Sequence, residues 1–449
     1  MPHNARHMGT NRRTVLLGSL AVALAAPAKA APLPTFGLDA AHFGVRPGAA
    51  TDQSAALQRA IDQAAHTRAP LMLAPGVYRA GGLTLPAGAQ LAGVRGATRL
   101  IFTHGPSLLS AEHAETVSLS GLTLDGGGQK LPDGRALVHI DDVAAVRITD
   151  CAVIGAGGNG VTLLNCDGEV THNTITGAAD NALFCNDSRG LVITANTIAK
   201  SGNGGIRVFQ SDKRYDGTLI ADNRIEDTAA RAGGSGENGN AINVFRAGDV
   251  IVRGNHIRNA AFSAIRGNSA SNIQIVGNSC GGLDEVAIFS EFGFQGAVVA
   301  DNIIDGAESG IAIANFNEGG RLATVRGNIV RNLRTQRPGE AGNGISVEAD
   351  TVVSGNVIER APLAGIAAGW GQFLRNVAIT GNVVREAGYG VAVSVVANAG
   401  VATISGNVFA GTLHGAIVGM EWHKPVTGDL ALASAERYPQ LKISGNQVN

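Results

Sequence analysis

The sequence predicts an all-β fold: a single-stranded parallel β-helix of about fourteen coils, with a helix covering its N-terminal end. Three observations predict it: an Asn pattern that recurs along the chain, short runs of alternating apolar residues between its copies, and a composition poor in aromatic residues. Of the 449 residues, 62 are Gly and 45% are apolar, but only 4% are aromatic. An interior with so few rings has to be filled by Val, Ile, Leu and Ala in thin, regular layers.

The Asn pattern defines the repeat. Of the 31 Asn in the chain, 29 lie from Asn159 onward. Most copies read Gly/Asp-Asn-x-Ile/Val and follow one another at intervals of 23 to 39 residues, a spacing typical of a solenoid. The Asn positions of the pattern are Asn173, Asn196, Asn223, Asn255, Asn278, Asn302, Asn328, Asn356, Asn382, Asn407 and Asn446.

Two kinds of short apolar run accompany each Asn. One precedes it, as in Val250–Arg253, and the other follows several residues later, as in Gly205–Val208. Runs this short bury a face only when each coil stacks on the next and pairs with it in parallel. Asn suits the corner between them because it tolerates a left-handed backbone and because its amide can bond to the equivalent amide one coil away.

Weaker coils extend the repeat upstream. They include Leu83–Leu85 and a coil in which Cys151 occupies the Asn position. The repeat array is therefore expected over residues 80–449, within a single β-helix domain at 31–449.

The N-terminal end of the array needs a cover, because the edge of its first coil is unpaired. Residues 52–66 form an amphipathic pattern with Leu57 and Ile61 on the apolar side and Thr51 or Asp52 available as N-cap. A capping helix is therefore expected there.

At the other end, residues 421–440 interrupt the last period. This segment contains a helix-like stretch, Leu430–Arg437, followed by Pro439. We expect it to cover the C-terminal end. The run Glu421–His423 is polar and aromatic, as a functional site would be, but packing of that cover explains it as well.

Residues 1–30 have the form of an export signal. Arg12 and Arg13 precede an Ala/Leu-rich run, and Ala28–Ala30 has the form of a cleavage site. A short membrane anchor or a chance pair of Arg residues is the alternative, although the run is shorter than the roughly 20 residues that span a bilayer. The signal predicts a periplasmic or secreted protein that leaves the cytoplasm by the twin-arginine pathway.

The start of the domain carries Phe43–Arg46, Thr51–Asp62 and Pro75–Tyr78. These segments resemble the opening of the pectate-lyase-like superfamily. The resemblance implies a right-handed β-helix over essentially the whole mature chain. Together with the export signal, the chain looks most like a group of exported repeat proteins that have no assigned activity. Fold carries over within such a superfamily, whereas chemistry does not.

A candidate site lies on the outward face of five successive coils, where alternation turns polar and aromatic side chains away from the interior. Aromatic rings can stack on sugar rings, and guanidinium groups bind uronate carboxylates. The alternative is that an overlying loop covers the Phe residues and that Arg266 only pairs with Glu291. The predicted substrate-binding residues are Phe184, Asn186, Phe209, Asn243, Phe245, Asn268, Phe289 and Glu291.

Three insertions interrupt the regular coils. Two of them, Ile225–Asn240 and Val330–Asn343, follow the Asn corner. The third, Gln210–Thr218, follows the outward strand and carries Lys213 and Tyr215. Long loops on a regular scaffold commonly carry function.

A lyase would need a base and a neutraliser for the uronate carboxylate. The candidates for these roles are Arg207, Arg266, Lys213 and Tyr215. A hydrolase would need two facing carboxylates, and Asp187 with Asp212 or Glu291 would serve. It is the less favoured interpretation because the Asn-Thr-Asp, Asp-Asp and Gly-His-Gly signatures of polygalacturonase-like hydrolases are missing.

No cofactor follows from the sequence, and Ca²⁺ is the only candidate cation. Its ligands would come from Asp187, Asp212 or Glu291, but no motif fixes them. The His residues, His104, His113, His139 and His172, have no metal-ligand spacing. The four Cys are expected to be buried thiols, and Cys185 and Cys280 point inward.

The charge balance excludes some partners. Lys and Arg total 35 against 36 Asp and Glu, so no strong field favours nucleic acid or an anionic membrane. The predicted partner is a polysaccharide or a cell-envelope glycan. The sequence thus predicts an exported β-helix protein that binds or cleaves a polysaccharide, with a non-catalytic glycan-binding or envelope scaffold as the alternative.

Overall fold

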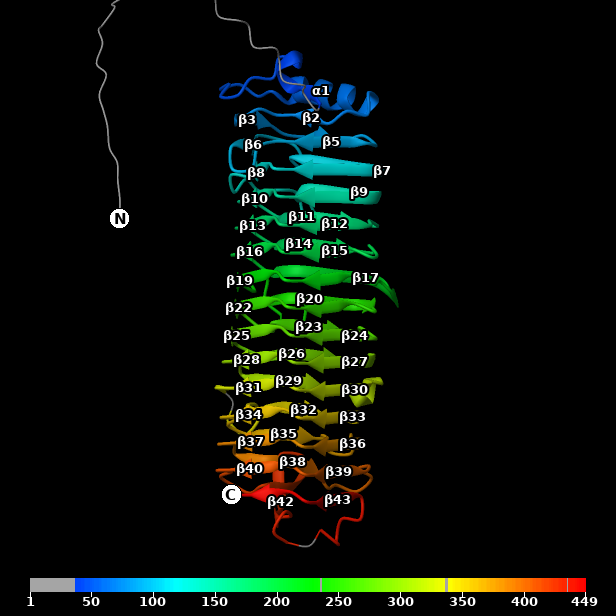
Figure 1. The fold of residues 1–449 in the computed structure, drawn as a ribbon, viewed down its shortest axis with the longest axis vertical. Helices are drawn as coiled ribbons and strands as arrows, with labels where there is room; N and C mark the ends of the chain where they lie inside the picture. Colours follow the sequence, from blue (N-terminus) through cyan, green and yellow to red (C-terminus); the bar gives the residue numbers. More distant parts are fainter. Residues whose placement is uncertain (1–36, 235, 336–337, 434) are drawn as a thin grey trace, which may run out of the picture. The chain divides into compact units, whose positions relative to one another are not determined.

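The computed structural model describes residues 37–449 except residues 235, 336–337 and 434. The predicted export signal at 1–30 lies outside the described residues. The predicted all-β fold is confirmed: the chain winds coil upon coil, and successive coils pair in parallel (Figure 1).

One wall of the stack is a 15-stranded sheet in which each strand pairs with its equivalent one coil away, so the chain makes about fourteen turns. Its strands, in chain order, are β3 (Gly76–Ala80), β6 (Thr98–Phe102), β8 (Thr123–Asp125), β10 (Ala152–Ile154), β13 (Thr174–Thr176), β16 (Thr197–Ala199), β19 (Arg224–Thr228), β22 (His256–Ala260), β25 (Ser279–Leu283), β28 (Ile303–Asp305), β31 (Ile329–Arg331), β34 (Val357–Glu359), β37 (Val383–Arg385), β40 (Val408–Ala410) and β44 (Gln447–Val448).

The other strands form a 29-stranded sheet that is bent into two rows. Row 1 consists of β4 (Leu83–Thr84), the first halves of β7 (Leu109–Ser120) and β9 (Ala136–Thr149), β11 (Asn159–Leu164), β14 (Asn181–Asn186), β17 (Gly204–Tyr215), β20 (Asn240–Gly248), β23 (Ile265–Asn268), β26 (Val286–Glu291), β29 (Ser309–Ile313), β32 (Ile345–Val347), β35 (Ala364–Ala368), β38 (Tyr389–Ser394), β41 (Ile417–Glu421) and β42 (Lys424–Asp429).

Row 2 continues each coil after the bend, and the long strands β7 and β9 run through both rows. Its strands are β1 (Leu38–Asp39), β2 (Leu71–Met72), β5 (Ala89–Ala92), the second halves of β7 and β9, β12 (Gly168–Thr171), β15 (Val192–Thr194), β18 (Leu219–Ala221), β21 (Ile251–Arg253), β24 (Ile273–Val276), β27 (Gln295–Ala300), β30 (Arg321–Arg326), β33 (Ala349–Ser354), β36 (Arg375–Thr380), β39 (Ala402–Ser405) and β43 (Leu441–Ser444).

The interior is one continuous cluster made mostly of Val, Ile, Leu and Ala, as the composition predicts. The four Cys are free and buried, which confirms their expected state. Burial raises the pKa of the Cys280 thiol to about 12, so this group stays protonated and unreactive near neutral pH.

The predicted Asn positions form a buried hydrogen-bonded ladder between row 2 and the 15-stranded sheet. Asn302 is representative: its main-chain N–H and its Nδ2 both donate to Oδ1 of Asn328, each at 3.0 Å. Its Nδ2 also donates to the Ile275 carbonyl at 2.9 Å. The Cys151 N–H donates to Asn173 Oδ1 at 2.9 Å, so Cys151 does occupy the Asn position. The ladder continues in the same way to Asn446.

The left-handed backbone at this corner belongs to the residue before each Asn, which corrects the expectation that the Asn itself adopts it. The preceding residue has φ between 55° and 67° throughout, and in most copies it is Gly or Asp. The two residues therefore have different roles. The first adopts the left-handed conformation that turns the chain, and the Asn that follows keeps ordinary backbone angles and directs its amide along the stack. The Gly/Asp-Asn pattern therefore encodes two separate roles.

Ala195 takes the left-handed position before Asn196, with φ of 55°. Its Cβ crowds the backbone in this conformation, and Gly does not. We expect Ala195→Gly to raise the free energy of unfolding by about 0.5–1 kcal/mol. Ala199→Gly, at a half-buried position within strand β16, is the matched control and should lower it by a similar amount. Urea denaturation of both variants checks the prediction, and a loss of stability in Ala195→Gly would contradict it.

The predicted capping helix is confirmed as α1 (Ser54–His66), which lies over the N-terminal end of the stack (Figure 1). The side chains of Leu57 and Ile61, which belong to this helix, are buried, as expected. The N-cap is Gln53 rather than Thr51 or Asp52. Asp52 still helps to start the helix, because its carboxylate accepts a hydrogen bond from the Ser54 N–H at 2.9 Å.

The expected helical cover at the C-terminal end is wrong. Strand β42 folds back antiparallel onto β41, and the described residues of 430–440 form turns. Asp429 explains the change, since its carboxylate accepts hydrogen bonds from the N–H groups of Ala416 and Ile417 and holds the returning strand in place. Leu430 is buried behind it.

Candidate functional site

The ten side chains predicted to share an outward face do align on row 1. Parallel registers place them in two lines that run from β14 through β17, β20 and β23 to β26. One line is Phe184, Arg207, Asn243, Arg266 and Phe289, and the other is Asn186, Phe209, Phe245, Asn268 and Glu291.

The aromatic rings on this face pack against one another. The Phe184 and Phe209 ring centroids are 5.7 Å apart in an edge-to-face arrangement, and those of Phe209 and Phe245 are 5.4 Å apart. All three side chains are half-buried, so they are not the open rings that the sequence suggests. The mutual packing of rings on adjacent coils removes much of their surface from water.

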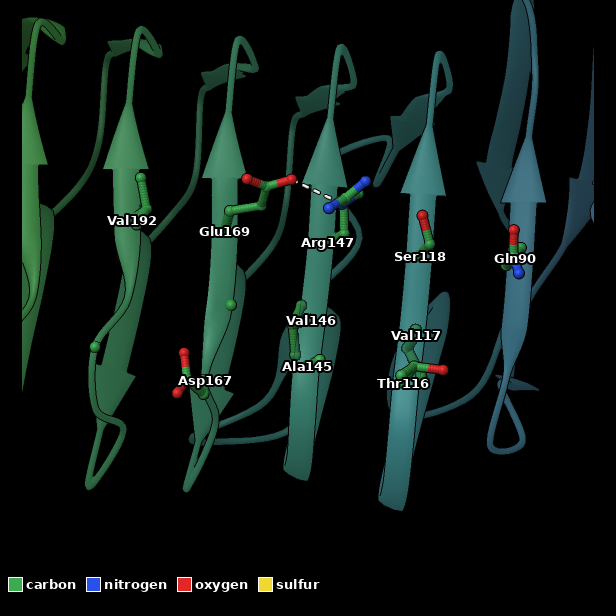
Figure 2. Close-up of a pocket in the computed structure, with 12 residues that line it drawn as sticks. Gln90, Thr116, Val117, Ser118, Ala145, Val146, Arg147, Asp167, Glu169 and Val192 are labelled. Atoms are coloured by element: carbon green, nitrogen blue, oxygen red, sulfur yellow. Dashed lines mark ion pairs between the residues drawn. The ribbon is translucent and has the colours of Figure 1, made fainter.

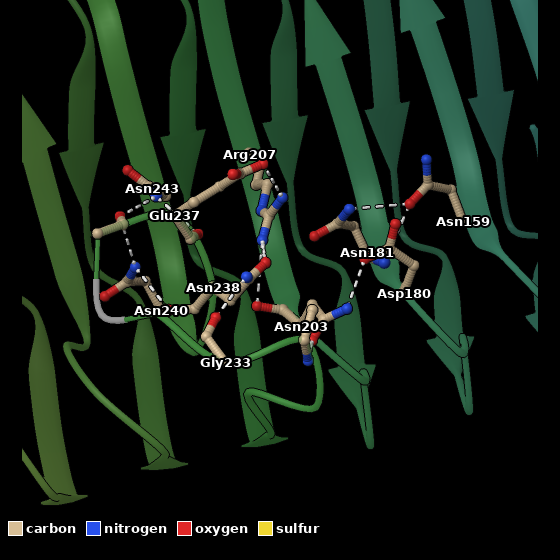
Figure 3. Close-up of polar contacts among 12 residues, drawn as sticks. Asn159, Asp180, Asn181, Asn203, Arg207, Gly233, Glu237, Asn238, Asn240 and Asn243 are labelled. Carbon is tan, nitrogen blue, oxygen red and sulfur yellow. Dashed lines mark hydrogen bonds and ion pairs between the residues drawn. The ribbon is translucent and has the colours of Figure 1, made fainter. Parts of the chain in front are cut away.

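Arg207 lies beneath the connection between β19 and β20, whose described residues include Glu237 and Asn238 (Figure 3). Its Nη2 donates to Asn238 Oδ1 at 2.6 Å, and its Nη1 donates to Glu237 Oε1 at 3.3 Å. Only 4% of the Arg207 side chain is exposed, against 68% of Glu237. Burial lowers the pKa of Arg207 from its ordinary value, and Glu237 and Asp180 oppose this effect.

Gly204 makes room for this buried guanidinium. A Cβ on Gly204 would lie 2.7 Å from Arg207 Nε and 2.5 Å from Asn181 Oδ1. Neither of these two buried atoms has a hydrogen-bond partner among the described residues, and the same holds for Asn243 Oδ1 on the next coil. Three adjacent coils therefore present unsatisfied polar atoms at one place, which is unusual for a folded interior.

Arg266 is held by two carboxylates. It bonds Glu291 through Nε at 2.6 Å and through Nη2 at 2.9 Å, and its Nη1 donates to Glu285 at 3.1 Å. Its guanidinium also lies 4.9 Å from the Phe289 ring centroid. The alternative interpretation, in which Arg266 pairs with Glu291, is therefore what the structure contains.

A pocket of about 430 Å³ opens between the β19–β20 connection and the aromatic rings. Phe209 and Phe245 provide its apolar surface, while Asn243, Asn268 and Glu237 provide its polar surface. Seven of the predicted site residues thus separate into two groups. Phe209, Asn243, Phe245 and Asn268 line the pocket, and Arg207, Arg266 and Glu291 lie buried in ion pairs.

Lys213 and Tyr215 lie elsewhere. Lys213 falls in the stretch of β17 between Phe209 and Arg214 where the register with β20 shifts, and Tyr215 lies just beyond it, paired with Gly248. Tyr215 is 64% exposed, and the Lys213 ammonium donates to the Gly293 carbonyl. Neither side chain lines the pocket. The predicted insertion at 210–218 is real, but it projects at the bend of the coil rather than over the pocket.

Asp187 stands beside this irregular stretch and accepts hydrogen bonds from the Ser211 N–H at 2.9 Å and from Arg214. Partial burial raises its pKa, but the bonds from Ser211 and the charge of Arg214 prevail and lower it. The Asp187 carboxylate is thus already bonded to Arg214 and Ser211, and the Glu291 carboxylate is bonded to Arg266. Asp212 is exposed. Among residues 37–449 as described, no group of three or more His, Cys, Asp or Glu is arranged to hold a metal ion. The candidate Ca²⁺ ligands therefore do not fit a shared site.

A second concave surface was missed at the sequence level. A pocket of about 540 Å³ on row 2 and one of about 640 Å³ at the bend between the two rows meet at Asp167. Figure 2 shows the first of them, crossed by the ion pair between Arg147 and Glu169 at 2.7 Å. The second includes Arg189 and Arg214. Alternating polar residues on a strand look like any solvated face, so the sequence offers no signal that distinguishes this groove.

No helix of the described chain is long and apolar enough to cross a membrane. The sequence matches the model of a family described as a right handed beta helix region, over residues 109–236 and 216–376. The chain belongs to this right-handed β-helix family. A comparison with the curated proteins gives no match.

Solved structures show how far the fold of this β-helix protein extends. It is similar to bacteriophage phi29 gene product 12, with 13% identity and a TM-score of 0.52, covering 84% of this chain and 66% of that one. It is also similar to the catalytic unit of a GH87 alpha-1,3-glucanase from Streptomyces thermodiastaticus, with 16% identity and a TM-score of 0.50, covering 94% and 70%. A PL6 alginate lyase in complex with a trisaccharide has 14% identity and a TM-score of 0.50, covering 92% and 95%. At these identities the likeness is one of fold.

Proposed function

We propose that this protein binds a glycan in the pocket lined by Phe209, Phe245, Asn243, Asn268 and Glu237. The observation that carries the proposal is the pairing of two aromatic rings with the amides of Asn243 and Asn268 and the carboxylate of Glu237 in one concave site. A pyranose ring has apolar C–H faces and hydroxyl edges, so it matches rings on one side and amide or carboxylate groups on the other. An enzyme acting on α-1,3-glucan and another acting on alginate have the same fold, which supports a glycan as the ligand class.

The geometry favours binding over cleavage. A lyase neutralises the uronate carboxylate with a cation that is free to receive it. Arg207 is occupied by Glu237 and Asn238, and Arg266 by Glu291 and Glu285. Lys213 and Tyr215 do not line the pocket. Cleavage of an acidic glycan at this face would require a substrate carboxylate to displace Glu237, whose side chain is the most exposed member of these pairs.

Cleavage is retained as the second candidate because the fold spans 95% of a PL6 alginate lyase. Incubation with alginate and other acidic polysaccharides would then produce new ultraviolet absorbance from unsaturated chain ends. Export to the periplasm or the exterior, by way of the signal at 1–30, is part of the proposal and accounts for access to such polymers. An envelope scaffold without any ligand is the alternative that a negative binding experiment would favour.

Phe245→Ala is expected to weaken glycan binding about tenfold or more, because it removes half of the aromatic surface of the pocket. A glycan array identifies the ligand, and calorimetry compares the variant with the wild type. Phe292→Ala, at an exposed Phe outside the pocket, is the matched control and should leave affinity unchanged. Equal affinity in Phe245→Ala, or no retention of any glycan by the wild type, would overturn the proposal.

A further inference from the structure

Both Trp residues of the chain meet at one place on the surface. Trp370 lies two residues after strand β35, and Trp422 lies at the tip of the β41–β42 hairpin. Their ring centroids are 5.4 Å apart, and the His423 ring lies 4.2 Å from Trp370. Trp370 is 39% exposed and Trp422 46% exposed. A large aromatic surface is thus left open to solvent at a point far from the pocket.

The backbone is strained to hold this arrangement. Trp422 has φ of 57° in the two-residue turn between Glu421 and Lys424, a conformation that favours Gly or Asn and costs a bulky residue about 1–2 kcal/mol. Gly371, with φ of 55°, lies directly under the indole, and a Cβ there would come within 2.3 Å of it. Trp422 therefore bears a strained backbone, and the lack of a side chain at Gly371 leaves room for the Trp422 ring. Strain of this kind clusters at functional sites.

Closure of the C-terminal end does not account for the exposed rings. The hairpin is held by Asp429, which bonds the Ala416 and Ile417 N–H groups, and by the buried Leu430. A small polar residue at position 422 would complete the same two-residue turn with less strain. The aromatic ring therefore serves something other than the turn.

Row 1 joins this aromatic pair to the pocket. The line of outward positions that contains Arg207 and Phe289 continues through Ala312, Ser346 and Ala367 on β29, β32 and β35. These three side chains are small, so they project little from the face between β29 and β35, whereas the larger Arg266 and Phe289 stand on the same line between the pocket and β29. From β20 to β35 there are five coil steps, which at about 4.8 Å per step is roughly 24 Å, or about five pyranose residues of an extended strand.

We infer that Trp370, Trp422 and His423 form a second sugar-contacting platform, and that the ligand is a polysaccharide strand lying along the coil axis across row 1. This inference rests on the proposed function, because the pocket holds one end of the same strand. It names the ligand class more narrowly: a polymer or an oligosaccharide of more than about five residues, rather than a mono- or disaccharide.

Intrinsic fluorescence tests the inference directly, since the only two Trp of the chain are both in the platform. The probes are alginate and α-1,3-glucan oligosaccharides of three and eight residues, added to the full chain. We expect an octasaccharide to shift or quench the Trp emission and to bind at least tenfold more tightly than the trisaccharide of the same sugar. Binding measured by calorimetry with an unchanged emission would overturn the platform and leave the pocket standing.

Trp422→Asn provides the second arm, because Asn accepts the left-handed backbone of this turn. The variant should lose the tenfold advantage of the octasaccharide while binding the trisaccharide as the wild type does. Trp422→Phe, which keeps an aromatic ring, should retain most of that advantage. Equal octasaccharide affinity in wild type and Trp422→Asn would overturn the platform, whereas a wild type that binds neither length would overturn the proposed function together with it.

Discussion

Replacing Arg266 with Leu is expected to lower the free energy of unfolding by about 3–5 kcal/mol. The Arg266 side chain is 7% exposed and the Glu291 side chain 4% exposed, so neither charge is well solvated. Without the guanidinium, Glu291 loses two short hydrogen bonds and its counter-charge in an environment of low dielectric constant. Chemical denaturation followed by circular dichroism measures the loss.

Two further variants test the cause of this loss. The double variant Arg266→Leu/Glu291→Leu removes both charges and should recover at least half of the lost stability, since buried ion pairs add little over apolar side chains of similar volume. Arg331→Leu breaks an exposed pair with Asp305 and should cost less than about 1 kcal/mol. A single Arg266→Leu variant as stable as Arg331→Leu would show that the buried pair carries no such penalty.

This expectation bears on how a catalytic role is tested. Loss of activity in Arg266 or Arg207 variants would not separate chemistry from folding, because both guanidinium groups are buried and bonded to carboxylates. Variants of the half-buried Phe residues that line the pocket perturb the site with less risk to the fold.

Asn302→Ala is the second large effect, with an expected loss of about 2–4 kcal/mol. The substitution removes the oxygen that accepts both the main-chain N–H and the Nδ2 of Asn278. It also removes the donor to the Ile275 carbonyl. These groups are buried in the stack and have no access to water, so their desolvation is no longer compensated. Denaturation midpoints of the purified variant check the value.

The loss of stability caused by an Asn→Ala substitution should depend on the position of the Asn in the ladder. Asn446 is the last member and is partly exposed, so Asn446→Ala should cost less than Asn302→Ala. Asn317→Ala, at an exposed residue outside the ladder, should change stability by less than about 0.5 kcal/mol. Equal costs at 302 and 317 would mean that the ladder does not contribute to stability.

The fold was predictable because it repeats. Each coil needs the same kind of corner residue, so the sequence contains many copies of one pattern. The Asn positions from Asn173 to Asn446 mark that corner. The C-terminal cover occurs once, and there a local helical pattern at 430–437 gave way to the contacts that Asp429 makes with the preceding strand. A segment that occurs only once cannot be compared with equivalent segments in other coils, so its structure has to be predicted from local helix propensity alone.

The candidate site was predictable in part. Alternation placed ten side chains on one face of row 1, and the registers confirm their alignment. It did not show that Arg207 lies beneath Glu237 and Asn238, because that contact joins residues about thirty positions apart through an irregular connection. The roles of Lys213 and Tyr215 as base or neutraliser stay predictions.

Sequence by itself determined the period, the buried Asn corner and the composition of the interior, because a stacked coil imposes the same local requirement on every repeat. Tertiary structure alone decided which outward side chains are open to a ligand. Exposure depends on what the connections between strands cover: the stretch containing Glu237 buries Arg207, while the β41–β42 hairpin brings Trp422 against Trp370 and leaves both rings in solvent. Each of these covering segments occurs once and lies outside the repeat. The contacts that it makes can therefore be seen only in the tertiary structure.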